Sequence, residues 1–464
     1  MKLTIWGAAE QVTGSMHLLE VDNYKILIDC GLNYEGGVEL AENENFPFDP
    51  HEIDVVILTH AHIDHSGNLP TLVKAGFGGQ ILCTYPTSDL TQLLLSDSVN
   101  IFLRKQEKKR GRGKFRKHQF ISNQPLYLHK HVNDTSDRIV PIAYHKEFKI
   151  NENITLTLIP TGHLLGAAAA HFTIRDEEEI KTIAFTGDIG RKNYPVLIDP
   201  EYLPATQYLV CESTYGGRLH NKTDNIHDVL VKAIKEACID QPGRLIIPAF
   251  SVGRTQSLVF SLNKIFSSGD LPPIPIFVDS PMANMATDIY RKHHQHVSEE
   301  ARSFYQKNGD EFEFENLSYV KELKESKEIS DHFEPCIIIS SAGMLEGGRI
   351  QDHLFHNIQN FYATILFIGF CAKGTLGNRL LRGDSIVNIK GRELSVFATI
   401  KKTDLLSGHG DHDDIVKYIE EIPGVLKTVF LVHGETENME ALKSALSKEN
   451  FDVVIPKKGL VFEL

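Results

Sequence analysis

The chain has 464 residues, of which 42% are hydrophobic and 23% are charged. These values are typical of a soluble globular protein, and the length allows two or more domains, each with a full core. The net charge of −13 argues against indiscriminate nucleic-acid binding over the whole surface. It does not exclude a nuclease, because metal ions and a local basic lining can supply the positive field.

Neither the hydropathy nor the cysteines indicate a membrane protein or a secreted protein. No apolar run reaches the ~18 residues that a membrane span needs, so we expect no membrane partner. The start, Met-Lys-Leu-Thr-Ile-Trp, lacks the apolar core of a signal peptide. The six cysteines are scattered and contain no CxxC motif, so a reduced, cytoplasmic setting is the simplest interpretation.

Short apolar runs alternate with glycine-containing turns over the first 85 residues or so. They predict strands at Leu3–Trp6, His17–Val21, Lys25–Asp29, Val55–Thr59 and Gln80–Cys83. Asp29 stands where one of these runs stops. It is either a turn-forming aspartate or a carboxylate that orients a metal-bound histidine or water.

The segment Thr59-His60-Ala61-His62-Ile63-Asp64-His65 follows the apolar run 54–58 and precedes residues that can begin a helix. Three imidazoles and one carboxylate therefore emerge on positions that can converge on one point. A lone histidine would be a packed or solvent-facing residue, but neutral imidazole and carboxylate oxygen are together the ligands of Zn²⁺ and similar ions. The cluster predicts a metal site and favours the orienting role for Asp29.

Residues 88–120 predict a long helix that runs into the one strongly basic segment of the chain, Arg104–His118. Such charge runs usually lie in solvent, so a solvated helix end is the favoured interpretation. The alternative is a patch that binds the phosphate backbone of a nucleic acid.

Two further ligand-type residues follow predicted strands in the next part of the chain. Strand patterns resume at Ile154–Ile159, Ala168–Ile174 and 181–185. His163 and Asp188 each lie just past such a strand and beside a glycine, so the backbone can turn and approach an ion closely. Either residue alone is weak evidence, but after the first cluster they extend the same site.

The pattern changes between about residue 213 and residue 397. Strands are predicted at Leu245–Pro248, Ile276–Asp279, Cys336–Ser340 and Thr364–Ile368, and helices near Asn225–Asp240, Gly253–Phe266, Ala283–Val297 and Arg349–Ile358. Their alternation predicts βαβ units and a doubly wound sheet. Glycine-containing loops follow the strands at 250–255, 279–283, 340–348 and 369–377, where backbone N–H groups can face phosphates.

Residues 398–464 return to the pattern of the first part. Strands are predicted at Val396–Ile400 and Thr428–Val432, and helices at Asp411–Ile422 and Glu437–Lys448. His409 and His433 lie near the ends of these runs. The middle block therefore reads as an insertion into one discontinuous domain.

Seven side chains make the predicted metal-ligand set: His60, His62, Asp64, His65, His163, Asp188 and His433. This number suffices for two ions if one carboxylate bridges them, and Asp188 is the candidate bridge because a carboxylate has two oxygens to share. Two ions ~3.5–4 Å apart that hold a hydroxide suit in-line attack at phosphorus. Zinc-bound water ionises near pH 7, so no separate protein base is required.

The leaving oxygen still benefits from a proton. His409 is the candidate donor, with Glu212 at a strand end holding it as imidazolium. The non-catalytic alternatives are a packed loop histidine for His409 and a helix cap or surface salt bridge for Glu212. From the residues alone, those alternatives are favoured for this pair.

With these residues placed, the chain resembles the β-CASP branch of the metallo-β-lactamase superfamily over nearly its whole length. Asp29 resembles the first motif of that family, His60–His65 the second, His163 the third and Asp188 the fourth. Glu212, His409 and His433 resemble the branch motifs called A, B and C. The resemblance implies an αββα metallo-β-lactamase domain, formed by residues 1–212 and 398–464, with a doubly wound β-CASP domain at 213–397.

The resemblance also implies an activity and a division of roles. The expected activity is that of a zinc-dependent ribonuclease, exo- or endonucleolytic, acting on single-stranded RNA in a cleft between the two domains. His60, His62 and His163 are expected to hold one zinc, and Asp64, His65 and His433 the second, with Asp188 between them and manganese as an alternative metal. The residues expected to carry catalysis are Asp29, Asp64, Asp188, Glu212 and His409. Those expected to contact the substrate are Ser341, Gly343, Met344, Arg254, Gly374 and Thr375.

Members of the family with a histidine at motif C are associated with RNA, so His433 favours RNA over DNA. The chain lacks the amino-terminal KH module and the extra carboxy-terminal domain of some relatives, which points to the compact bacterial-type members. The resemblance allows a homodimer.

Two other functions compete with that of a ribonuclease. A small-molecule hydrolase of the same superfamily, for thioesters or lactams, would not need an inserted block of this size. A non-catalytic RNA-binding homologue would be expected to have lost metal ligands, and this chain retains all seven.

Overall fold

The computed structural model describes residues 1–34, 40–111, 125–176, 179–221, 225–332 and 334–464. The chain forms two compact units, each assembled from more than one segment. The first unit comprises Met1–Lys192, Asp199–Leu219 and His409–Leu464, and the second comprises Asn193–Ile198 and His220–Gly408. The boundaries expected between the metallo-β-lactamase and β-CASP domains, at residues 213 and 398, remain predictions.

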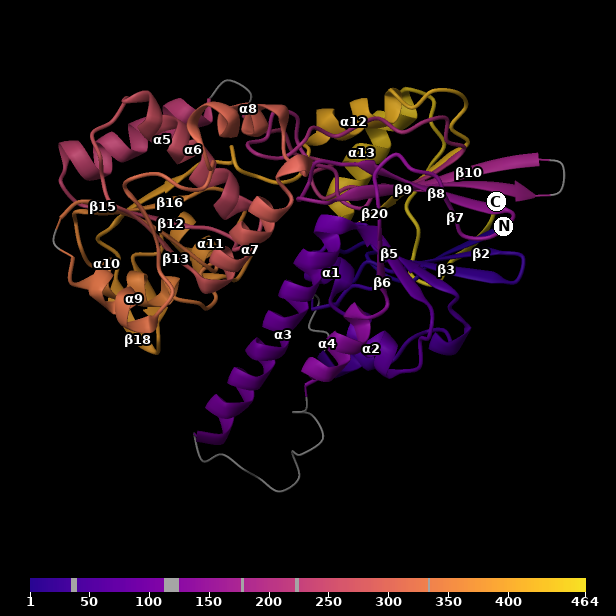
Figure 1. Cartoon of the computed structure of the whole chain (residues 1–464), viewed down its shortest axis with the longest axis horizontal. Coiled ribbons are helices and arrows are strands. Elements are labelled where there is room, and N and C mark those ends of the chain that lie inside the picture. The colour runs from indigo at the N-terminus through magenta and orange to yellow at the C-terminus, as the bar shows by residue number, and fades with distance from the viewer. Residues whose placement is uncertain (35–39, 112–124, 177–178, 222–224, 333) are drawn as a thin grey trace. The chain divides into compact units, whose positions relative to one another are not determined.

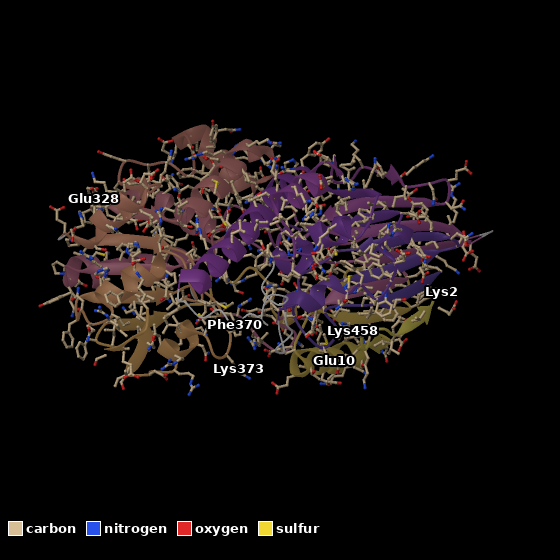
Figure 2. The ribbon with its side chains drawn as sticks, turned by 90° about the horizontal axis from the view of Figure 1, so that it is seen from below. Lys2, Glu10, Glu328, Phe370, Lys373 and Lys458 are labelled. Atoms are coloured by element: carbon tan, nitrogen blue, oxygen red, sulfur yellow. The ribbon has the colours of Figure 1, made fainter. Side chains whose placement is uncertain are left out.

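The first unit contains two seven-stranded sheets (Figure 1). One has the order β22-β1-β2-β3-β4-β5-β6: Val461–Glu463, Lys2–Ile5, His17–Val21, Tyr24–Ile28, Val55–Ile57, Gln80–Thr84 and Ile139–Ile142. The other has the order β21-β20-β11-β10-β9-β8-β7: Val453–Val454, Thr428–Val432, Tyr208–Glu212, Glu179–Phe185, Ala168–Asp176, Ile154–Pro160 and Phe148–Lys149. At one edge, Lys2 of β1 pairs with Glu463 of β22, and Figure 2 labels Lys2 there.

The two sheets pack face to face because alternate residues of each strand are apolar on the inner side. Ile26 and Ile28 of β3 belong to one core cluster that also contains Phe172 and Phe185 from the other sheet. Leu27, between the two isoleucines, belongs instead to a cluster with Leu72 of a covering helix. This alternation follows from the two-residue period of a strand, and it gives each sheet one face toward the partner sheet and one toward helices.

Helices cover both outer faces of this sandwich, which confirms the expected αββα fold. On the side of the first sheet lie α1, α2, α3 and α4: Ile63–Ser66, Leu69–Lys74, Tyr85–Gly111 and His129–Ser136. On the side of the second sheet lie α12 and α13, at His412–Glu420 and Thr436–Lys448, whose buried residues share a cluster with the outer residues of that sheet. Two short 3₁₀ turns, Leu40–Glu44 and Pro50–Glu52, precede β4.

The second unit is built on a six-stranded parallel sheet of order β14-β13-β15-β12-β16-β19. Its strands are Leu317–Tyr319, Ile276–Asp279, Cys336–Ser340, Arg244–Pro248, Ala363–Phe367 and Thr399–Lys402. Strands that are buried on both faces read as continuous apolar runs, as Cys336–Ser340 does with all five residues buried. A small hairpin, β17 at Ile386–Ile389 and β18 at Arg392–Ser395, follows β16.

Helices lie on both faces of this sheet, as a doubly wound fold requires (Figure 1). The helices are α5 Ile226–Ile234, α6 Arg254–Ser268, α7 Pro281–Lys292, α8 Glu299–Asn308, α9 Leu323–Ser330, α10 Ile350–Asn357 and α11 Leu376–Leu381. A π-helical segment, Lys235–Asp240, continues α5, and a 3₁₀ turn, His294–His296, follows α7. The predicted fold, an αββα sandwich together with a doubly wound α/β domain, is thus confirmed.

Several predicted elements differ from the observed ones in extent. The helix predicted over 88–120 begins at Tyr85 and is described to Gly111, and most of the basic segment 104–118 lies outside the residues whose side chains are described. The strand predicted at Val396–Ile400 lies at Thr399–Lys402 instead, and it pairs with β16 in the second unit. Because it is an edge strand with one partner, its register depends on β16 rather than on its own composition.

The structure also bears on the membrane and cysteine expectations. Among the described residues, no helix is both long enough and apolar enough to cross a bilayer. All six cysteines are buried as free thiols.

Candidate metal centre

The seven ligand-type residues lie in the first unit, at the carboxyl ends of strands from both sheets. β4 leads into His60, His62, Asp64 and His65, whereas β8, β10 and β20 lead into His163, Asp188 and His433, respectively. Parallel and antiparallel pairing brings these strand ends to the same edge of the sandwich. Residues up to 369 positions apart in sequence, Asp64 and His433, thereby meet. They form two groups of candidate ligands, and a third group contains Asp188, Glu212 and His433.

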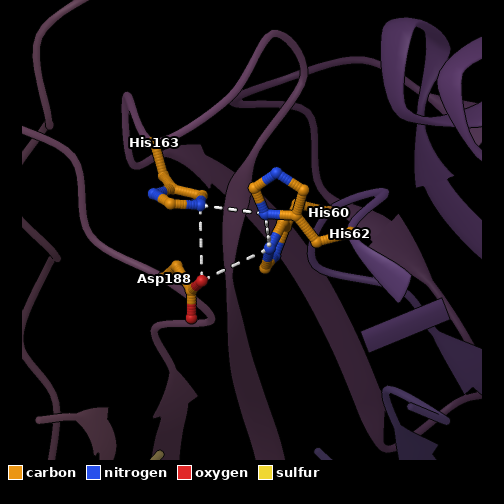
Figure 3. Close-up of side chains that lie close together, drawn as sticks. All are labelled: His60, His62, His163 and Asp188. Carbon is orange, nitrogen blue, oxygen red and sulfur yellow. Dashed lines mark hydrogen bonds and ion pairs between the residues drawn. The ribbon is translucent and has the colours of Figure 1, made fainter. Parts of the chain in front are cut away.

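The first group consists of His60, His62, His163 and Asp188 (Figure 3). The Nδ1 atom of His62 lies 3.1 Å from Nε2 of His60 and 3.1 Å from Nε2 of His163. The Oδ2 atom of Asp188 lies 3.4 Å from Nε2 of His60 and 3.3 Å from Nε2 of His163. His60, His163 and Asp188 are buried and His62 is half-buried.

The second group consists of Asp64, His65 and His433. The Nε2 atoms of His65 and His433 are 3.1 Å apart, and Nε2 of His433 lies 3.6 Å from Oδ2 of Asp64. The other oxygen of Asp188, Oδ1, lies 3.3 Å from Nε2 of His65 and 3.6 Å from Nδ1 of His433. The two oxygens of Asp188 therefore face different groups.

The spacing of these atoms fits a bound divalent cation. Four tetrahedral ligand atoms that are each ~2.0–2.1 Å from a zinc ion lie ~3.3 Å from one another. The distances in the first group, 3.1–3.4 Å, match this value. In addition, Oδ1 of Asp188 is buried and accepts no hydrogen bond from the described residues, as expected for an atom that binds an ion.

Asp29 contacts the ring nitrogen of His65 that does not face Asp188. Its Oδ2 atom lies 2.6 Å from Nδ1 of His65, and its carboxylate also accepts hydrogen bonds from the backbone N–H and the hydroxyl of Thr59, at 2.8 and 2.9 Å. Asp29 and His433 both adopt left-handed backbone conformations, with φ of 57° and 53°. Such conformations are uncommon for residues with a side chain and are concentrated at functional sites.

Gly187, which precedes Asp188, lets the backbone there lie close to Thr59. A Cβ atom there would lie 2.7 Å from the Cβ of Thr59, and the φ of Gly187 is +55°. A side chain at this position would therefore displace Thr59, and with it the hydrogen bonds to Asp29.

Burial and mutual charge set the protonation of the cluster. Burial lowers the pKa of His60 well below its usual value, with a further lowering by the neighbouring His65, and burial also lowers the pKa of His62. Burial would raise the pKa of Asp188, but the surrounding imidazoles, His433 first, hold it well below its usual value. Burial would lower the pKa of His65 and of His433, but the charge of Asp188 raises both. Because a metal binds neutral imidazole and ionised carboxylate, His60, His62 and Asp188 favour the binding forms, whereas a cation at His65 and His433 would displace a proton.

Glu212 and His409 form a pair beside this cluster. Nδ1 of His409 lies 3.2 Å from Oε1 of Glu212, and the backbone N–H groups of Ile189 and Thr214 donate to the same carboxylate at 2.6 and 3.2 Å. The ring centroids of His409 and His163 are 4.5 Å apart. Burial would lower the pKa of His409, but the charge and hydrogen bond of Glu212 raise it to about 9. The carboxylate of Glu212 thus orients the ring of His409 and favours its protonated form.

The six expected substrate-contacting residues all lie in the second unit: Arg254 begins α6, and the others lie on the loops after β15 and β16. Ser341 Oγ lies 2.7 Å from Ser280 Oγ, and the carbonyl of Met344 accepts a hydrogen bond from Gly377 N–H at 3.2 Å. Gly343 faces the backbone of Phe250, and the guanidinium of Arg254 stacks on the ring of Phe250 at 4.6 Å. Gly374 has a left-handed backbone and Thr375 caps the start of α11. Substrate contact by these residues stays a prediction.

Three residues near the cluster were missed by the sequence analysis. Thr59 donates to Asp29, and Thr214 Oγ1 lies 3.0 Å from Nδ1 of His433. Tyr215 stacks on the ring of His409 with centroids 5.8 Å apart. The only available signal was their position, since each lies within three residues of a recognised motif and carries a hydroxyl or an aromatic ring.

Comparison with known families covers most of the chain. The Metallo-beta-lactamase superfamily matches residues 10–248, the Beta-Casp domain matches residues 255–380, and the Zn-dependent metallo-hydrolase RNA specificity domain matches residues 393–456. The first of these models alone spans more than half of the sequence.

Individual relatives give the same result. Ribonuclease TTHA0252 of Thermus thermophilus is 30% identical over 461 residues, with 99% of each chain covered. Transcription termination factor FttA of Methanocaldococcus jannaschii is 30% identical over 94% of this chain and 67% of its own length. A solved protein of unknown function from Enterococcus faecalis V583 shares the fold, with a TM-score of 0.53 at 15% identity and with 100% of this chain and 99% of that chain covered. The chain therefore belongs to the β-CASP branch of the metallo-β-lactamase superfamily.

Proposed function

We propose that this chain is a metal-dependent ribonuclease that hydrolyses phosphodiester bonds of single-stranded RNA by a two-metal mechanism, with zinc or manganese as the metal. RNA is supported as the substrate by the RNA specificity domain matched at residues 393–456 and by a full-length relative that is named a ribonuclease.

The observation that carries the proposal is the position of Asp188. One of its oxygens faces His60 and His163, and the other faces His65 and His433, all at 3.3–3.6 Å. A single-metal hydrolase would need only one of these groups. A carboxylate with imidazoles at both oxygens is what a shared ligand between two cations requires.

The residues then divide into two sets. His60, His62 and His163 would hold one cation, and Asp64, His65 and His433 the other, with Asp188 common to both. When bound, the two ions supply an activated water at neutral pH and neutralise the charge of the scissile phosphate.

The remaining residues of the centre orient groups and move a proton. Asp29 fixes the ring of His65 through its Nδ1 atom, which leaves Nε2 directed at Asp188 and available to a cation if one were bound there. His409, oriented by Glu212, would donate a proton to the leaving oxygen of the RNA. Breaking a phosphodiester releases an alkoxide, so a donor at this position lowers the barrier.

The test is incubation of the metal-loaded protein with end-labelled RNA in 5′-phosphate, 5′-hydroxyl and circular forms. We expect cleavage of at least one form, and the comparison reveals direction and end requirement. His62→Ala should reduce cleavage at least about 100-fold, because removal of a ligand disturbs the metal more than the 10–100-fold effect of its outer partners.

His129→Ala serves as the matched control, because His129 is an exposed histidine of the same unit that lies outside the candidate ligand groups and whose Nε2 atom lies 3.2 Å from Asn100 Oδ1. Undiminished RNA cleavage by folded His62→Ala protein would contradict the assigned site. Turnover of thioesters without any cleavage of RNA would replace the proposal with a small-molecule hydrolase.

A further inference from the structure

A cavity of about 680 Å³ opens in the second unit, and none of the residues discussed as substrate contacts lines it. It lies between the loop after β16, helix α11 with the turn that follows it, and the edge strand β19. Its lining includes Phe370, Leu381, Arg382, Val396, Ile400 and Lys402. The volume falls within the ~300–1,000 Å³ of typical small-molecule sites.

The walls of the cavity are fixed by hydrogen bonds between its segments. The Arg379 side chain donates to Asp384 at 2.9 Å, and Val396 N–H donates to the Ser385 carbonyl at 2.9 Å. On the other side, α11 is held close to the loop, because a Cβ atom at Gly377 would lie 2.8 Å from Sγ of Cys371. The cavity is therefore preformed and does not require a rearrangement to open.

The interior of the cavity is apolar and its rim carries an aromatic ring. Leu381, Val396 and Ile400 are only half-buried although they are aliphatic, so their exposed parts face the cavity rather than a packed core. Phe370 is 36% exposed and lies on the same loop as Lys373 (Figure 2). An exposed phenyl ring beside aliphatic side chains is a surface on which a flat, weakly polar ring can stack.

The charges at the rim favour an anion. Lys401 pairs with Glu236, and Asp384 pairs with Arg379, so these charges are already compensated. Among the described residues, neither Lys402 nor Arg382 has an ion-pair partner. Both are exposed, and in β19 Lys402 shares a strand face with Ile400, because side chains alternate with a period of two.

We propose that this cavity binds one nucleotide of a single-stranded RNA, through residues other than those expected to contact the scissile phosphate. The base would stack on Phe370 over the aliphatic floor, and the adjoining phosphate would lie against Lys402 and Arg382. A nucleotide unites a flat apolar ring with an anion, which is the combination that the lining offers. The inference rests on the proposed ribonuclease function, because that function brings single-stranded RNA to the chain.

Binding is measured separately from cleavage. The full-length protein is treated with a chelator so that RNA remains intact, and the affinity for fluorescein-labelled oligouridylate is followed by fluorescence anisotropy over a series of salt concentrations. We expect Phe370→Ala to raise Kd about tenfold, as for the loss of one base–aromatic stack. Lys402→Ala should reduce the slope of log affinity against log salt by about 0.7, the value for one lost phosphate contact on a single strand.

Matched variants separate the site from a general effect of charge. Lys307→Ala removes an exposed lysine of α8 in the same unit and should leave Kd and the salt slope unchanged. Lys402→Arg should restore the slope, because the charge is kept. Thermal unfolding of each variant should match that of the wild type, since both Phe370 and Lys402 are exposed.

A photocrosslink locates the base directly. Oligoribonucleotide that contains 4-thiouridine should form its adduct on the peptide that contains Phe370. If the Phe370 and Lys402 variants keep the Kd, the salt slope and the crosslink of the wild type, the inference is wrong, even if metal-loaded protein cleaves RNA normally. Conversely, intact binding at this cavity with no cleavage of any RNA form would leave the nucleotide site in place and remove the ribonuclease proposal. Crosslinking by free 4-thiouridine monophosphate but not by the oligonucleotide would assign the cavity to a free nucleotide and overturn the RNA assignment.

Discussion

The carboxylates of the metal centre differ in what their oxygens touch, and this difference assigns their roles. Both oxygens of Asp188 face imidazole nitrogens from two groups, and one of them accepts no hydrogen bond from the described residues. Asp29 instead uses its oxygens on Thr59 and on the Nδ1 atom of His65. This difference supports the proposed roles, in which Asp188 is a ligand and Asp29 orients one.

Asp29→Asn tests the orienting role. The amide keeps the size of the side chain but presents one acceptor instead of two, so either Thr59 or His65 loses its partner. We expect metal affinity to fall by about 10–100-fold, which is the usual effect of removing such a partner from a metal-bound histidine. Competition with a chelating dye measures this loss. Asp22→Asn, at an exposed turn of the same unit, is the control, and equal affinities for the two variants would contradict the assigned role.

The pair formed by Glu212 and His409 predicts a specific dependence on pH. The pKa of His409 is about 9, because the charge of Glu212 outweighs the lowering by burial. The imidazole is therefore protonated below about pH 9 and loses its proton as the pH rises through that value. If His409 donates the proton to the leaving group, kcat/KM should decline over the same range.

Glu212→Gln should move that decline to lower pH. Without the carboxylate, the remaining effect of burial lowers the pKa of His409, so the donor form is lost earlier as the pH rises. The pH profile of RNA cleavage by the metal-loaded variant measures the shift. A uniform loss of activity with an unchanged profile would indicate that Glu212 has only a structural role.

At the scale of elements, the loops of the second unit are held by a buried carboxylate at the end of β13. Asp279 is fully buried and bonds to Arg349 at 2.6 Å, His353 at 2.7 Å and Ser326 at 2.6 Å. These partners come from the starts of α9 and α10 and from the residues just before α10. A single side chain thus fixes the segments around the loop that contains Ser341.

Arg349→Ala should destabilise the second unit by about 3 kcal/mol, because it removes the compensating charge of a buried carboxylate. Urea unfolding measures this change. Arg379→Ala is a suitable comparison, since its pair with Asp384 is partly exposed and should contribute less than about 1 kcal/mol. Similar losses for the two variants would show that Asp279 does not depend on Arg349.

The sequence predicts those parts of the site whose residues are close together along the chain. His60, His62 and His65 lie within six positions after one strand, so the sequence alone predicts a cluster there. His433 could be added because it also follows an apolar run, and strand ends gather at one edge of a sheet. The contact of Thr214 with His433 could not be foreseen, because it exists only through the parallel pairing of β11 with β20 in a register that places Glu212 beside Val432.

The doubly wound sheet of the second unit was predictable because short apolar runs alternate there with helical stretches, whereas the αββα fold of the first unit was expected from the resemblance of its motifs. Edge elements were less predictable. β19 has one partner strand and includes two lysines, so its composition does not reveal where it begins or which sheet it joins. The cavity beside it was not foreseen either, because it is formed by segments that are individually unremarkable in sequence.

At the scale of the whole molecule, all seven ligand-type residues belong to one unit, although they come from segments on both sides of the second unit in sequence. Bound metal should therefore stabilise the first unit and leave the second largely unaffected, because a ligand stabilises only the structure that binds it. Hydrogen exchange followed by mass spectrometry, with and without chelator, tests this expectation.

Peptides that cover β4 and β10 should exchange faster once metal is removed, whereas peptides that cover β12 and β15 should not. Restoring metal should restore protection. Equal deprotection of both units would show that the metal stabilises the chain by a route other than this centre.

The most direct test of the centre is a titration of zinc or manganese into metal-free protein, with bound metal and RNA cleavage measured on the same samples for the wild type and for Asp188→Asn. We expect the wild type to bind two ions per chain and to cleave RNA only as the second site fills, whereas Asp188→Asn should lose the second ion and at least about 100-fold in cleavage rate. Cleavage by the metal-free wild type, or full cleavage by Asp188→Asn with a single bound ion, would contradict the role of Asp188 as the bridge between two cations.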